Sequence, residues 1–79
     1  MNWKHFIYAI KIKLKKNGFS AYADEILMAE VAAGNVSSDI LSDVVSVINK
    51  IETENAEAFD CINSETDSLR QALKRMRKD

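Results

Sequence analysis

The side chains that most often carry catalysis or bind metal ions are sparse in this chain of 79 residues, which has one histidine, His5, and one cysteine, Cys61. A zinc site needs three or four ligands at close spacing, and nucleophilic catalysis needs an activated serine or cysteine beside a base. His5 and Cys61 are far apart in the sequence, and neither belongs to a motif of these kinds. We therefore predict a protein without catalytic residues, a metal site or a cofactor, which is not an enzyme.

Carboxylates are the chemical groups that do recur at helical spacing. General acid–base catalysis by a carboxylate pair needs a concave pocket that excludes water and separates the two pKa values. Three helices formed by only 79 residues offer little room for such a pocket, so a solvated acidic face is the better interpretation. We expect this face to bind a basic protein partner through five residues: Asp39, Asp43, Glu57, Asp60 and Asp67.

The net charge of −1 conceals three blocks of charge. Residues 1–16 contain five lysines and no acidic residue, residues 17–69 contain eleven acidic residues and one lysine, and residues 70–79 contain five basic residues and one acidic residue. This order matches the preference of acids for helix N-termini and of bases for helix C-termini. It also indicates possible contacts with an anionic partner, for which the candidates are Arg70, Lys74, Arg75, Arg77 and Lys78.

Contact with nucleic acid through these bases is the alternative function, that of a regulatory accessory factor. It is the less favoured one, because a nucleic-acid-binding domain usually has a clear basic footprint. The basic end of this chain is short and contains no aromatic residue, and the chain is mildly acidic overall.

Two segments that end at glycines predict a helical hairpin in the N-terminal half, with helices over about residues 2–16 and 21–33. Gly18, after Asn17, and Gly34 follow these segments, at the position where a helix commonly ends in the left-handed conformation. Tyr8 and Ile12 lie outside the apolar stripe of the first helix, on a side that also carries lysines. That stripe, with the spacing of one helical face, consists of Trp3, Phe6, Ile7, Ile10 and Leu14.

Residues 38–77 contain neither glycine nor proline, and their apolar residues keep one helical face. The spacing predicts a single helix ~60 Å long. The alternative is a break near residues 63–64, where Asn63 and Ser64 are poor helix formers, which would give a four-helix monomer. The continuous stripe favours the unbroken helix, because a turn would usually reset its angular position.

Two helices of ~20 Å cannot cover a helix of ~60 Å. The second half of the long helix would therefore expose an apolar stripe, and exposed stripes of this kind usually mark an interface. We predict a helical-bundle or coiled-coil homodimer, parallel or antiparallel, with an interface formed by Phe59, Ile62, Thr66, Leu69, Leu73 and Met76.

The whole chain, residues 1–79, is expected to form one small all-α domain. No run approaches the ~20 apolar residues of a membrane span, and residues 1–16 lack the pattern of a signal peptide. A single cysteine fits a reducing compartment, which predicts a cytoplasmic protein. The leading hypothesis is a non-enzymatic module for protein–protein interaction, comparable to a small bacterial immunity protein, antitoxin or adaptor.

Overall fold

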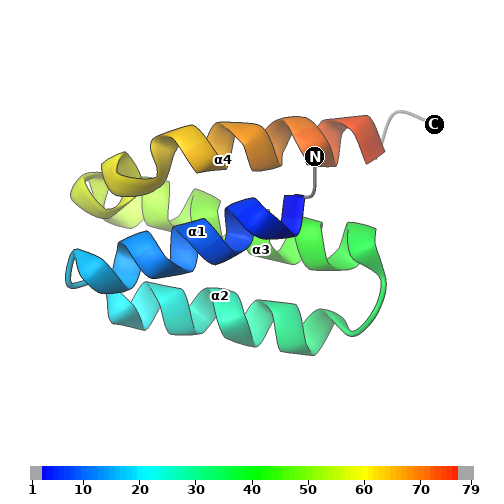
Figure 1. The fold of residues 1–79 in the computed structure, drawn as a ribbon, viewed down its shortest axis with the longest axis horizontal. Helices are drawn as coiled ribbons and strands as arrows, with labels where there is room; N and C mark the ends of the chain where they lie inside the picture. The colour runs from blue at the N-terminus through cyan, green and yellow to red at the C-terminus, as the bar shows by residue number, and fades with distance from the viewer. Residues whose placement is uncertain (1–2, 77–79) are drawn as a thin grey trace.

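Four segments of residues 3–76, the part of the chain that the computed structural model describes, form helices (Figure 1). Helix α1 spans Trp3–Lys16, α2 spans Ser20–Ala33, α3 spans Ser37–Glu54 and α4 spans Ala56–Met76. Consecutive helices run in opposite directions (Figure 1), and α1 and α3 each pack against α2 and α4. This is the up-down arrangement of a four-helix bundle, and it confirms the prediction of an all-α fold.

The N-terminal hairpin forms as the glycines predict. Gly18 adopts φ 87°, its N–H donates to the Lys15 carbonyl at 3.2 Å, and the Phe19 N–H donates to the Leu14 carbonyl at 2.8 Å. This pair of hydrogen bonds is the Schellman ending of a helix. Gly34 ends α2 with φ 74°, so the helices predicted at 2–16 and 21–33 match α1 and α2 within the described residues.

The long helix predicted for residues 38–77 does not form, because the chain reverses at Asn55. Asn55 has φ −150° and ψ 94°, and its N–H donates to the Ile51 carbonyl, which ends α3. Its side-chain Oδ1 accepts a hydrogen bond from the Ala58 N–H at 3.1 Å, the bond by which asparagine caps the start of a helix. The longest dimension of the bundle is 37 Å, which excludes a straight helix of ~60 Å.

The alternative of a break near 63–64 is wrong in its position, since Asn63 and Ser64 lie inside α4. The apolar stripe stays continuous across the reversal because Ile51 and Ala58, on either side of Asn55, are both fully buried in the same core. A continuous apolar stripe therefore indicates which side of each helix faces the core. It does not test whether the helix axis reverses.

The reversal also changes the role of the stripe that was assigned to a dimer interface. Four of its residues, Ile62, Thr66, Leu69 and Leu73, are buried within their own chain, and Phe59 and Met76 are half-buried against the same core. Helices α1 and α3 supply the cover that the long-helix arrangement lacked. The stripe is therefore covered within its own chain, and the reason for expecting a dimer through these residues no longer holds.

Each of the four contacts between neighbouring helices carries one ion pair within residues 3–76. Lys11–Glu30 joins α1 to α2 and Lys13–Glu65 joins α1 to α4, each with an N–O distance of 2.6 Å. Lys50–Glu25 joins α3 to α2 at 2.6 Å, and Arg70–Glu52 joins α4 to α3 at 2.8 Å. An exposed ion pair contributes only ~0–1 kcal/mol. The pairs do explain part of the block pattern of charge, because the wholly basic α1 lies between acidic residues of α2 and α4.

Candidate functional site

The two most reactive side chains, His5 and Cys61, lie at different ends of the bundle. His5 is in the first turn of α1, beside the end of α4, and its ring meets Phe6 edge-on with the centroids 6.2 Å apart. Cys61 is in the second turn of α4, and its Sγ donates to the Glu57 carbonyl at 3.4 Å. Within residues 3–76, no group of three or more His, Cys, Asp or Glu side chains could hold a metal ion.

The candidate acidic face is divided between the two ends of the bundle. Asp39 and Asp43 are exposed near the start of α3, whereas Glu57 and Asp60 are exposed near the start of α4. Since α3 and α4 are antiparallel, these pairs lie at opposite ends (Figure 1). Asp67, in the middle of α4, accepts a hydrogen bond from a neighbouring side chain. One partner therefore cannot contact all five carboxylates through a single small face.

The basic end is also smaller than the sequence indicates. The Arg70 guanidinium donates to Glu52 at 2.8 Å and to Asn49 at 2.7 Å, and it lies 5.5 Å from the centre of the Phe59 ring. Its charge is therefore paired within its own chain, at the surface of the bundle. Lys74 and Arg75 are exposed in the last turn of α4. The other two candidate anion contacts, Arg77 and Lys78, lie outside the described residues.

Glu65 shows that partly buried charge in this bundle is structural. Lys13 Nζ donates to Glu65 Oε2 at 2.6 Å, while Glu65 Oε1 is buried without a hydrogen-bond partner within the described chain. Burial raises the pKa of Glu65, but the hydrogen bond and charge of Lys13, together with a backbone hydrogen bond, outweigh burial and lower the pKa overall. Glu65 therefore stays ionised at neutral pH, which suits an ion pair and does not suit a general acid.

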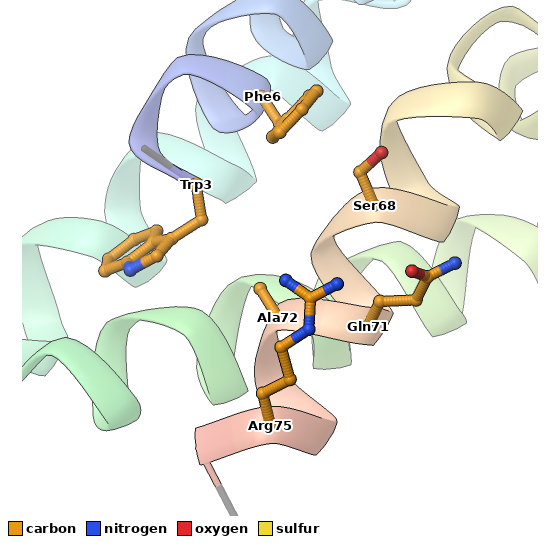
Figure 2. Close-up of a pocket in the computed structure, with 6 residues that line it drawn as sticks. All are labelled: Trp3, Phe6, Ser68, Gln71, Ala72 and Arg75. Atoms are coloured by element: carbon orange, nitrogen blue, oxygen red, sulfur yellow. The ribbon is translucent and has the colours of Figure 1, made fainter. Parts of the chain in front are cut away.

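A pocket of about 220 Å³ lies between the start of α1 and the end of α4. Figure 2 shows the Arg75 side chain running along α4 to lie beside Ala72, while Trp3 and Phe6 form the facing wall on α1. Its six lining residues are Trp3, Phe6, Ser68, Gln71, Ala72 and Arg75. We call it the α1–α4 pocket.

The polar groups of the α1–α4 pocket are not equally available. The Gln71 Nε2 donates to Asp67 Oδ2 at 3.1 Å, which leaves the Gln71 carbonyl oxygen as an acceptor. The Ser68 hydroxyl donates to the Ser64 carbonyl at 3.4 Å. Arg75 makes no ion pair within residues 3–76. The pocket thus combines one uncompensated cation, one free acceptor and aromatic walls.

A second feature is an exposed apolar surface shared by α1 and α2. Tyr8 is 62% exposed, Ile12 45% and Leu27 46%, and Met28 and Val31 are more exposed than any of these. Tyr8 and Ile12 are four residues apart on α1, and Leu27 and Val31 are four residues apart on α2, so each pair lies on one side of its helix. We call these five residues the α1–α2 apolar surface.

This surface is hollowed between its two helices. A groove of about 230 Å³ is lined by residues of both, namely Tyr8, Lys11, Ile12, Lys15, Ala23, Asp24 and Leu27. The groove therefore runs through the α1–α2 apolar surface, with charged side chains at its edges. A concave apolar site with a few polar groups is the usual form of a binding site.

The sequence alone identified only some of the residues that form the α1–α4 pocket and the α1–α2 apolar surface. Tyr8 and Ile12 stood out because they fall outside the core stripe of α1, and the structure places both on the surface among lysines. Trp3 and Phe6 were assigned to the core, and they are only half-buried because they line the α1–α4 pocket. No signal in the sequence joined them to Arg75, since that contact depends on the reversal at Asn55.

In comparisons with known proteins, no family model, no curated protein and no solved structure matches the chain. No helix within residues 3–76 is long and apolar enough to cross a membrane.

Proposed function

We propose that this protein is a non-enzymatic module for protein–protein interaction, and that the α1–α2 apolar surface is the part that binds the partner. The observation that carries the proposal is that the exposed apolar side chains of Tyr8, Ile12 and Leu27 line one groove between the two helices, with Met28 and Val31 exposed further along α2. Single exposed apolar residues are ordinary, but a contiguous patch on a monomer is often functional. An adaptor, or an inhibitor of the immunity or antitoxin type, would use such a surface.

The partner we propose is an amphipathic helix of another protein. A helix can insert apolar side chains at every third and fourth position into a groove between two helices, and the groove lined by Ile12 and Leu27 offers that shape. A second copy of the whole chain fits less well. A stable interface between two proteins buries ~800 Å² per partner, and five side chains that are each partly covered offer less.

Charge supports an acidic partner helix. Lys15 and Lys16 make no ion pair within the described residues. Of the acids on α2, Glu25 and Glu30 are already paired with lysines, which leaves Asp24. The surroundings of the α1–α2 apolar surface are therefore net positive, and acidic residues beside the apolar ones of the partner would complement them. This replaces the basic partner expected from the composition of residues 17–69.

Site-specific photo-cross-linking in the native host tests the proposal. A benzoylphenylalanine at Ile12 or at Met28 should form a covalent adduct with the partner, whereas the same group at Ser46 or Asn63, exposed on α3 and α4, should not. The partner, identified from the adduct and purified, should then bind the bundle directly. Adducts that form equally at all four positions would contradict the proposal, as would a purified partner that does not bind.

Lipid binding is the competing outcome, because apolar residues among lysines also suit an anionic membrane surface. The intact protein is mixed with vesicles of anionic phospholipid and sedimented. We expect it to stay in the supernatant, since a groove suits a protruding side chain better than a flat bilayer does. Sedimentation that Ile12→Glu abolishes would assign the surface to lipid instead of protein.

Nucleic acid is a second candidate partner, supported by one observation. The antiparallel packing of α1 and α4 brings the start of the first basic block beside the last one, at the end of the bundle where Lys4, Lys74 and Arg75 are exposed (Figure 1). This candidate predicts binding of a fluorescent oligonucleotide that weakens steeply with salt and weakens further in Lys74→Gln. An oligonucleotide that shows no binding at low salt would eliminate it.

A further inference from the structure

We propose that the α1–α4 pocket binds the C-terminal carboxylate of a peptide that ends in an apolar residue. The proposal does not depend on the α1–α2 apolar surface, which lies on the other side of α1. It rests on the cation, the acceptor and the aromatic walls that the pocket brings together.

The cation selects an anionic group. Among residues 3–76, Arg75 is the only charged residue that lines the pocket, and no carboxylate among them pairs with it. Figure 2 shows its guanidinium beside Ala72 on the α4 wall, with Trp3 and Phe6 on the α1 wall, and the residue stays exposed to a ligand. A guanidinium presents parallel N–H groups that match the two oxygens of a carboxylate.

The acceptor and the walls distinguish a peptide end from other anions. The Gln71 carbonyl oxygen is free because Asp67 holds the amide nitrogen, so it can accept the backbone N–H that precedes a terminal carboxylate. Trp3, Phe6 and Ala72 supply apolar surface for the last side chain. A lone inorganic anion would leave that surface unused. A nucleic acid needs several cations along its backbone, whereas the described lining of this pocket contains one.

The fluorescence of Trp3 provides a direct assay, because it is the only tryptophan in the chain. The full-length protein is titrated with N-acetyl-phenylalanine, which carries the carboxylate, the N–H and an apolar side chain. We expect a saturable change in Trp3 emission with a Kd on the order of 1 mM or tighter. In ¹H–¹⁵N spectra, the Trp3 indole and Gln71 amide signals should shift over the same range of concentration.

Two related compounds test the contributions of the carboxylate and of the N–H separately. N-acetyl-phenylalaninamide lacks the charge and should bind at least ~10-fold more weakly, which is the loss expected for one charged hydrogen bond. 3-Phenylpropionate keeps the charge and lacks the N–H, so it should bind more weakly than N-acetyl-phenylalanine. Equal binding of the amide would overturn the proposal, and equal binding of 3-phenylpropionate would reassign the pocket to free carboxylic acids.

A matched pair of variants tests the residue assignment. Arg75→Gln should weaken binding of N-acetyl-phenylalanine by ~10-fold. Lys74→Gln removes the same charge from the same exposed turn without touching the pocket, and it should leave binding unchanged. Equal losses in the two variants, or equal shifts with inorganic phosphate or a short oligonucleotide, would show a general response to anions and overturn the proposal.

This outcome is distinguishable from failure of the proposed protein-binding function. The variants Ile12→Glu and Leu27→Glu alter the α1–α2 apolar surface and neither lines the α1–α4 pocket. Both should bind N-acetyl-phenylalanine as the wild type does. If either loses that binding while keeping its helical circular dichroism, the two surfaces are coupled and the pocket is not an independent site.

Discussion

Replacing Asn55 with alanine should destabilise the bundle, and the sign of this effect tests the fold. In the structure, the Asn55 side chain accepts the Ala58 N–H and so caps α4 at the reversal. Loss of an asparagine cap typically costs ~1 kcal/mol. In a continuous helix through the same residue, alanine would instead be more favourable than asparagine by up to ~0.7 kcal/mol.

The natural control is Asn63→Ala, because Asn63 is exposed inside α4. There alanine should leave stability unchanged or raise it by a few tenths of a kcal/mol. Urea unfolding followed by circular dichroism gives both values, and the lower stability of the Asn55 variant corresponds to a fall in Tm of about 4–8 °C for a domain of this size. Asn55→Asp keeps an acceptor and should recover most of the loss.

The reasoning would be refuted if Asn55→Ala were stabilising. It would also be refuted if Asn63→Ala were the destabilising variant, because that result would move the break back to residues 63–64. Light scattering on the Asn55 variant adds a check, since a straightened helix could recover its core cover only by exchanging α4 with a second chain.

Three further predictions concern the interior and the turns. Thr66 is fully buried and its Oγ1 has no hydrogen-bond partner within residues 3–76. Thr66→Val should therefore raise the free energy of unfolding, measured by urea titration, by ~1 kcal/mol. A lower free energy of unfolding would mean that the hydroxyl does make a hydrogen bond. Because the pKa of Glu65 is lowered in the fold, its ion pair stabilises the bundle at neutral pH and this contribution is lost as pH falls below ~4. Lys13→Met should therefore flatten the acid limb of a stability–pH curve, and an unchanged curve would exclude this ion pair as its cause. Gly18→Ala places a Cβ at φ 87° with no steric contact nearby, so calorimetry should show a loss of ~1 kcal/mol from backbone strain alone.

The helices of the N-terminal half could be predicted because the sequence of each marks where the helix begins, which side of it is apolar and where it ends. Gly18 has a local role that does not depend on the rest of the fold, and its positive φ follows from the residue type. The C-terminal half could not be resolved in the same way. Thr53, Glu54 and Asn55 are a weak helical stretch, but so are Asn63, Ser64 and Glu65, and only tertiary packing selects between them.

The candidate sites were predictable only where one helix makes them. Tyr8 and Ile12 could be placed on the surface from the spacing along α1 alone. The partner residues Leu27 and Val31 could not be, because much of the circumference of α2 is apolar and its sequence does not show which side is covered. Charge was a poor guide to the candidate sites. Arg70, one of the candidate anion contacts, is used in an ion pair between helices, and the candidate acidic residues are divided between the two ends of the bundle.

The central claim is that the α1–α2 apolar surface binds the partner, and calorimetric titration of the purified partner against three forms of the bundle tests it most directly. Ile12→Glu places a charge in the groove, whereas Ser46→Glu places the same charge on the exposed side of α3. We predict that Ile12→Glu weakens binding at least ~10-fold, corresponding to ~1.4 kcal/mol, and that Ser46→Glu binds as the wild type does. A partner that binds the Ile12 variant with unchanged affinity would contradict the claim.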